Sequence, residues 1–256
     1  MDNYLLRLLV KSRLMTPDLK QKLLYMKKPL LIFSAIVAAS VSSASAQVLA
    51  QWTFETSTST NNIIGAGLSP ASAQSGVNAD IGTGTGSAFH ATAATVWSIP
   101  AGNGNPHAWS ANMWSVGDYF QFSTSTVGFS GVKLSYDQVG SGTGPRDFNL
   151  QYSLDGSSFT TFASYSLNSA VTSWSTVTAN PLSSFSFDLS SVTALNNAPN
   201  VYFRITDTST TSINGGAVGT AGSGRVDNFT IAVPEPAAAL LTGFGLMAVL
   251  VIRRRR

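Results

Sequence analysis

The chain has 256 residues, of which 11% are charged and 44% hydrophobic, and it contains no cysteine and only two histidines. This composition excludes a disulfide scaffold, zinc-thiolate sites and thiol nucleophiles, and leaves little material for histidine-based chemistry. The formal net charge of +3 is unevenly distributed, because residues 47–232 hold four basic against nine acidic side chains. An acidic body argues against nucleic acid as a partner, since that binding requires Lys and Arg to neutralise phosphates.

An apolar run over residues 30–41 follows two lysines and precedes a run of small residues that ends with Ala44 and Ala46. A short basic region, an apolar core and a small-x-small cleavage site define a secretory signal peptide. We therefore predict a signal peptide over 26–46, with Gln47 as the first residue after cleavage. The partners that this segment implies are the Sec translocon and signal peptidase. A buried core helix is the alternative, which the flanking lysines disfavour.

Residues 1–25 precede this signal and carry leucines and five basic side chains. They would make an unusually long n-region for a signal peptide. Our hypothesis is that translation starts at Met26 and that 1–25 are an upstream extension of the gene model. The alternative is a genuine extended n-region that begins at Met1.

Between residues 47 and 232, apolar side chains alternate with polar ones at a period of two, which is typical of half-buried strands. Such sets recur along the body: Trp52 and Phe54; Phe120 and Phe122; Val132, Leu134 and Tyr136; Phe148, Leu150, Tyr152 and Leu154; Phe185, Phe187 and Leu189; Val201, Phe203 and Ile205; Phe229 and Ile231. The Asp-Gly pair at 155–156 marks a hairpin turn. We predict an all-β fold, a two-sheet antiparallel β-sandwich over 47–232. The least periodic segment, 56–86, is expected to form a long loop with one short strand at most.

Three features follow one another at the C-terminus: Pro234-Glu235-Pro236, an apolar stretch over 237–252, and Arg253, Arg254, Arg255 and Arg256. The apolar stretch is shorter than the roughly 20 residues that span a membrane unaided. Long arginine side chains extend the effective span because they reach the interface. We predict a transmembrane helix within 233–256 whose arginines stay in the cytoplasm, as the positive-inside rule requires.

This order of tripeptide, apolar helix and terminal arginine cluster resembles the PEP-CTERM sorting signal of Gram-negative bacteria. The resemblance implies recognition by an exosortase, a membrane cysteine protease that removes the helix. It implies transient anchoring in the inner membrane, after which the body reaches the cell surface or the extracellular matrix. It also links the protein to exopolysaccharide production and biofilm. A plain C-terminal membrane anchor is the alternative for 233–256.

Four segments of the body resemble the jelly-roll domains of secreted bacterial proteins that are related to carbohydrate-binding modules: 51–55, 117–122, 150–156 and 225–229. Many such domains hold a structural Ca²⁺ between an acidic residue after the first strand and an aspartate of the last strand. Glu55 and Asp227 occupy the matching places. Carboxylates suit this hard cation, and backbone carbonyls would complete its six to eight oxygen ligands. The alternative is that both residues are capping or surface carboxylates.

Sugar stacking is one interpretation of the tryptophans, because aromatic faces pack on pyranose rings. Trp109 and Trp114 are the candidates, since they lie in a polar stretch with Asn105, His107 and Asn112. Packing in the core is the alternative for both, because large aromatic side chains dominate core burial.

No enzymatic signature emerges from the sequence. The glycine-rich stretch 82–86 lacks the spacing of a dinucleotide fingerprint and has no following lysine. His90 and His107 have no Ser or Asp placed beside them, and nothing in the sequence pairs two carboxylates as a glycosidase requires. We therefore expect no catalytic activity.

These features predict an exported, exosortase-processed protein of the cell surface or the exopolysaccharide matrix. Its sandwich would be structural or adhesive and would associate with extracellular polysaccharide. One alternative is a glycan-binding module with a defined site near Trp109 and Trp114. A polysaccharide-active enzyme is the less favoured alternative.

Overall fold

The computed structural model describes residues 46–56 and 73–234. The predicted upstream extension, nearly all of the predicted signal peptide, and the predicted transmembrane helix with its arginine cluster lie outside the described residues. Within the part that is described, no helix is long and apolar enough to cross a membrane.

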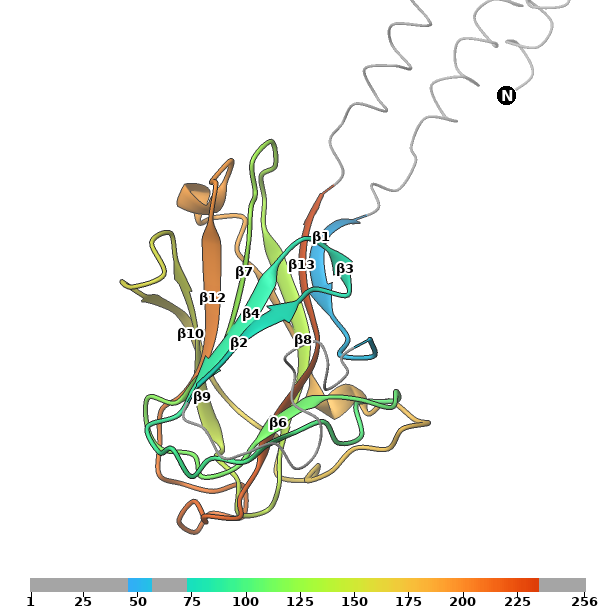
Figure 1. The fold of residues 1–256 in the computed structure, drawn as a ribbon, viewed down its shortest axis with the longest axis vertical. Coiled ribbons are helices and arrows are strands. Elements are labelled where there is room, and N and C mark those ends of the chain that lie inside the picture. Colours follow the sequence, from blue (N-terminus) through green and yellow to red (C-terminus); the bar gives the residue numbers. More distant parts are fainter. Residues whose placement is uncertain (1–45, 57–72, 235–256) are drawn as a thin grey trace, which may run out of the picture. The chain divides into compact units, whose positions relative to one another are not determined.

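The described body consists of two antiparallel sheets (Figure 1). The seven-stranded sheet has the order β11 (Ser184–Asp188), β8 (Lys133–Gly140), β13 (Gly224–Pro234), β1 (Ala46–Trp52) and β3 (Ile81–Gly82), with β6 (Trp109–Ala111) paired to β13 and β5 (Trp97–Ser98) paired to β6. The six-stranded sheet has the order β10 (Thr160–Ser166), β9 (Asp147–Ser153), β12 (Val201–Asp207), β7 (Tyr119–Thr124), β4 (Thr85–Phe89) and β2 (Ala73–Asn78). Two short 3-10 turns, η2 (Pro181–Ser183) and η3 (Thr193–Leu195), lie in the connections. The predicted all-β, two-sheet antiparallel sandwich is confirmed.

The period-two pattern places apolar side chains between the sheets. In β7, Phe120 and Phe122 are fully buried, while Tyr119 and Gln121, which alternate with them, are only partly buried. Phe122 stacks on Phe229 of β13 across the sandwich, with ring centroids 3.9 Å apart. Burial of a side chain of this size stabilises the fold by about 1.5–3 kcal/mol. The largest fully buried side chains of the core are all aromatic.

The segment 56–86 holds more strand than expected, because β2 and β3 lie within it and β4 begins at Thr85. These strands are built from small and polar residues, so they carry no apolar alternation to detect. The pairing of β2 with β4 brings Gly86 of β4 close to Val77 of β2. A Cβ atom at Gly86 would lie only 3.1 Å from Cβ of Val77.

The predicted hairpin turn at 155–156 joins β9 to β10, which pair antiparallel. Gly156 has φ +71°, a conformation that favours glycine. The backbone amides of Ser157 and Ser158 both donate to Oδ1 of Asp155. Leu154, expected on the apolar face of the strand, lies in the turn and is 45% exposed, because β9 ends at Ser153.

A local irregularity in β13 positions two polar residues of the last strand. The register between β13 and β8 shifts between Asp227 and Thr230. Asn228 lies in this shift with φ +52°, as is found where a bulge inserts an extra residue into one strand. The bulge lies where the loop 102–107 meets the sheet.

Candidate functional site

Trp109 and Trp114, the candidates for sugar stacking, are core residues in the structure, which agrees with the alternative of core packing. Trp109 is 0% exposed and packs on Phe54 and Phe120, with ring centroids 5.9 and 5.1 Å away. Trp114 is 6% exposed, and its indole donates to the carbonyl of Ala111. Packed in this way, neither ring has a free face on which a sugar could stack. The candidate binding surface therefore lies elsewhere on the molecule.

The outward side of the six-stranded sheet carries large polar and aromatic side chains. We call this surface the polar face, and it consists of Ser87, Phe89, Tyr119, Gln121, Asn149, Gln151, Tyr202, Arg204 and Thr206. Their neighbours along each strand are buried in the core, which turns these side chains outward.

The strand register brings polar residues that are distant in the sequence into one row. Arg204 of β12 lies opposite Gln121 of β7 on one side and opposite Gln151 of β9 on the other. The row continues to Ser87 of β4 and to Thr161 of β10. It therefore crosses five adjacent strands near the middle of the sheet.

Hydrogen bonds fix the side chains of this row. Nε of Arg204 donates to Oε1 of Gln121 at 2.7 Å, and Nε2 of Gln121 donates to Oγ of Ser87 at 3.2 Å. On the other side, Gln151 accepts from Thr206 at 2.9 Å and donates to Thr161 at 3.3 Å. The row is thus ordered by its own contacts before any ligand arrives.

Two aromatic rings hold the guanidinium of Arg204. Its Cζ lies 3.8 Å from the ring centroid of Tyr119 and 3.6 Å from that of Phe159, the residue just before β10. Nη2 also donates to the Tyr119 hydroxyl at 3.2 Å. Partial burial lowers the pKa of Arg204, yet an arginine keeps its charge at physiological pH. A charged group is therefore presented in a fixed orientation.

Aromatic surface adjoins this row. Phe89 is 42% exposed, and its ring centroid lies 6.0 Å from that of Tyr119. The Tyr202 ring packs beside the turn at Gly156, where a Cβ atom would lie 3.2 Å from the ring. Amides, hydroxyls and a guanidinium supply donors and acceptors, while the rings supply apolar faces. This combination suits a ligand that has both hydroxyl groups and apolar ring faces.

The sequence pattern did not point to the polar face, although a signal was present. The signal is a large polar side chain at an outward position of a strand. Tyr119 and Gln121 occupy successive outward positions of β7, and Arg204 occupies an outward position of β12. Their assembly into one surface depends on strand order, which a single sequence does not reveal.

A second polar cluster contains Glu55 and Asp227, the candidate calcium ligands. The loop 102–107 links them, because Oδ2 of Asp227 accepts from the amide of Asn103 at 2.9 Å and Oε1 of Glu55 accepts from the amide of His107 at 2.9 Å. Asp227 is fully buried, and this burial raises its pKa to about 7. Both carboxylates therefore hold the same loop.

Three oxygen atoms converge beside Gly102. A Cβ atom there would lie 1.6 Å from Oδ1 of Asn105, 2.2 Å from the carbonyl oxygen of His107 and 2.6 Å from Oδ2 of Asp227. Oδ1 of Asn105 is buried and has no hydrogen-bond partner within the described residues. No cluster of three His, Cys, Asp or Glu side chains occurs in that same part of the chain. Amide, carbonyl and carboxylate oxygens are nevertheless the ligands that Ca²⁺ takes, so these residues fit that cation.

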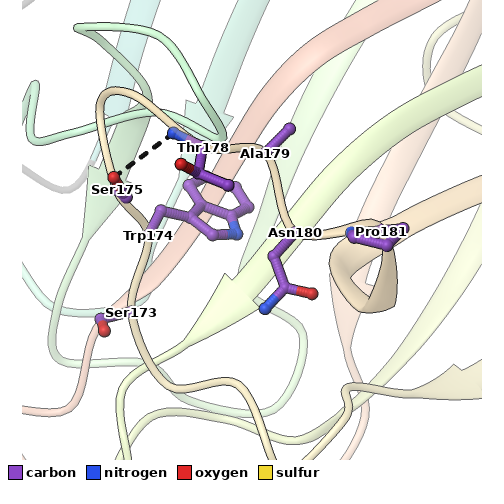
Figure 2. A pocket seen from close by; sticks show the side chains of 7 residues that line it. All are labelled: Ser173, Trp174, Ser175, Thr178, Ala179, Asn180 and Pro181. Atoms are coloured by element: carbon purple, nitrogen blue, oxygen red, sulfur yellow. Dashed lines mark hydrogen bonds between the residues drawn. The ribbon is translucent and has the colours of Figure 1, made fainter.

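A surface hollow of about 310 Å³ lies next to this loop, and Figure 2 shows the side chains that line it: Ser173, Trp174, Ser175, Thr178, Ala179, Asn180 and Pro181. Trp174 is only 8% exposed and donates to Ser183 at 3.0 Å. The amide of Asn180 donates to Oδ1 of Asn103 at 2.7 Å. The segment around the hollow therefore supports the loop 102–107 and offers little free aromatic surface.

The sequence matches no protein-family model and no curated protein. Among solved structures, it is similar to the CBM22-2 xylan-binding domain from Paenibacillus barcinonensis Xyn10C, at 14% identity and a TM-score of 0.38, over 73% of this chain and 99% of that one. It is also similar to the K2 cleaved adhesin domain of Lys-gingipain, at 14% identity and a TM-score of 0.36, over 71% and 96%. A third is CBM28, a carbohydrate-binding module specific for non-crystalline cellulose, at 13% identity and a TM-score of 0.32, over 67% and 96%. The ligand of this chain must be inferred from its own side chains.

Proposed function

We propose that the protein is an exported, non-catalytic β-sandwich that binds extracellular polysaccharide along the polar face. The observation that carries the proposal is the row through Gln121, Arg204 and Gln151, which internal hydrogen bonds fix on an outward sheet surface. Side chains held in place before binding lose little conformational entropy when a ligand arrives. Such a row is therefore suited to recognition.

The shape of the row favours a chain-like ligand. It crosses five strands, and four inter-strand spacings of about 4.8 Å give it a length of about 19 Å. Such a length accommodates several consecutive sugar rings. Phe89, which is 42% exposed, and the partly buried Tyr202 lie beside the row and would offer ring surface to the apolar faces of the sugars. A linear polysaccharide would thus meet hydrogen-bonding groups and aromatic rings together.

Affinity gel electrophoresis tests this proposal. The purified protein should be retarded by at least one soluble polysaccharide of an extracellular matrix, and Gln121→Ala should reduce that retardation. Gln51→Ala is the matched control, because Gln51 lies on β1 of the other sheet and is also partly buried. Equal retardation of Gln121→Ala and the parent protein, or equal loss in both variants, would contradict a site on the polar face.

For the C-terminal segment we propose processing by an exosortase, with release of the body to the cell surface or matrix of a Gram-negative bacterium. The order of Pro234-Glu235-Pro236, apolar stretch and arginine cluster supports this proposal. Pro234 ends β13 and is exposed, so a cut just beyond it would spare the core. A plain membrane anchor is the alternative, and the intact mass of the native protein separates the two.

For the cluster beside Gly102 we propose a structural calcium ion held by Oδ2 of Asp227, Oδ1 of Asn105 and the carbonyl of His107, with Glu55 nearby. The convergence of these oxygens supports the assignment. When bound, the cation would supply a positive counter-charge for the buried Asp227 carboxylate. It would also fasten the loop 102–107 to the last strand. Two plain capping carboxylates are the alternative.

A further inference from the structure

Arg204 is the one cation of the polar face, and it forms no ion pair within the described part of the chain. Of the other three basic side chains between 47 and 232, Lys133 and Arg146 each pair with an aspartate, and Arg225 lies on β13 of the other sheet. The stretch 57–72 contains no charged residue. The positive charge at the centre of the polar face is therefore not neutralised by the body.

The groups around Arg204 are all neutral. Nε donates to an amide oxygen of Gln121, and Nη2 donates to the Tyr119 hydroxyl. The rings of Tyr119 and Phe159 lie against the guanidinium. Removing a cation from water without a counter-charge costs free energy. These contacts orient the charge but leave its neutralisation to another molecule.

The free part of the guanidinium has the shape of a carboxylate site. Nη1 makes no hydrogen bond within the described residues, and Nη2 uses only one of its two hydrogens on Tyr119. The two terminal nitrogens can therefore donate in parallel to the two oxygens of one carboxylate, which is the strong bidentate arrangement. A neutral sugar hydroxyl has one oxygen and no charge, so it cannot form this pair of parallel, charge-assisted hydrogen bonds.

We propose that the polysaccharide bound on the polar face is acidic and that a carboxylate of its sugar residues pairs with Arg204. This inference rests on the proposed function, because it names the chemical class of the ligand at the same surface. Tyr119, Phe159 and Gln121 hold the guanidinium, and the aromatic rings and amides around it bind the neutral parts of the chain. Charge complementarity at one central residue then selects uronic-acid polymers over neutral ones.

The test uses matched pairs of polymers. Polygalacturonate, alginate and xanthan are each compared with their carboxyl-reduced forms, which keep the backbone and lose the charge, and dextran sulfate serves as a plain polyanion. Dissociation constants come from affinity electrophoresis or calorimetry with the purified protein. We expect one acidic polymer to bind about tenfold more tightly than its reduced form, as one charge-assisted pair provides. That preference should weaken as salt is raised.

Variants at two arginines locate the effect. Arg204→Gln should abolish the preference for the acidic form while retaining binding to the reduced form. Arg225→Gln, on the other sheet, should leave the preference unchanged. Arg204→Lys keeps the charge but lacks the planar fork, so it should retain part of the preference. Circular dichroism and the melting temperature of each variant establish that it is folded.

The outcomes separate the two proposals. Equal binding of acidic and reduced polymers, lost in Gln121→Ala, would overturn the acidic ligand and leave glycan binding intact. Dextran sulfate binding as tightly as the best uronic-acid polymer would also overturn it, because simple charge attraction would then suffice. Binding to none of the seven polymers would count against both the acidic ligand and the polar face.

Discussion

Ala46 lies opposite Pro234 in the antiparallel ladder between the first and last strands. Both residues are exposed, and the core begins further inside the ladder, with Leu49 of β1 and Val233 of β13. The expected signal cleavage after Ala46 and the proposed cut at the Pro-Glu-Pro motif thus lie beside the two adjacent ends of one strand pair. Neither cleavage would remove a side chain of the core that the described residues form.

An intact-mass measurement on native protein from culture medium or matrix tests both cleavages. We expect a species that begins at Gln47 and ends near Pro236. Additional mass in hexose-sized steps would reveal glycosylation without affecting this assignment. A species that keeps Arg256 and occurs only in membranes would make the tail a permanent anchor and contradict sorting.

Trp109→Ala should destabilise the sandwich strongly, because it removes a fully buried ring that packs on Phe54 and Phe120. The expected loss in the free energy of unfolding is about 3–5 kcal/mol. Denaturant unfolding measures it, and Val177→Ala is the control, since Val177 is 84% exposed and should change stability little. A near-neutral Trp109→Ala would mean that this ring does not support the core.

Two buried groups give the stability opposite dependences on pH. Burial lowers the pKa of His90 from 6.5 to about 4, so its contribution is complete above pH 6.5 and is lost as the pH falls to 4. Burial raises the pKa of Asp207 from 3.8 to about 6, so its contribution is complete below pH 3.8 and is lost as the pH rises to 6. Each contribution changes the free energy of unfolding by about 3 kcal/mol over its pH range.

Single variants separate these contributions when stability is compared with the parent protein at each pH. Asp207→Asn should make stability rise more steeply between pH 4 and 6, because the opposing contribution is gone. His90→Gln should make stability fall over the same range. Urea unfolding at half-unit pH steps measures both slopes. Slopes that change in the same direction in the two variants would be incompatible with these pKa shifts.

Calcium should raise the melting temperature of a chelator-treated sample. Asp227→Asn should remove this rise because it deletes the buried carboxylate, and Gly102→Ala should remove it because the added Cβ would occupy the space among the oxygens. Asp188→Asn is the matched control, since Asp188 is exposed and pairs with Lys133. An unchanged melting temperature in the parent protein would favour the capping interpretation of Glu55 and Asp227.

The sequence predicted the parts of the fold that depend on local alternation. Phe120 with Phe122, and Val201 with Phe203, mark strands wherever they lie in the sandwich. It did not predict β2 and β4, because small residues such as those around Gly86 pair by close approach and carry no apolar signal.

The binding surface was harder to predict for a different reason. Gln121, Arg204 and Gln151 meet only because β12 lies between β7 and β9, an order that periodicity does not encode. The polar residues beside Trp109 and Trp114 in the sequence indicate a sugar site, yet both rings are buried and both pack on Phe120 of the core.

Backbone chemical-shift mapping tests the central claim most directly. An oligosaccharide cut from the best-binding polymer is titrated into the isotopically labelled protein. We predict shifts concentrated on β4, β7, β12, β9 and β10 around Arg204, with little change elsewhere. Shifts concentrated instead around Trp109 and Trp114, or at the hollow beside Trp174, would contradict a ligand site on the polar face.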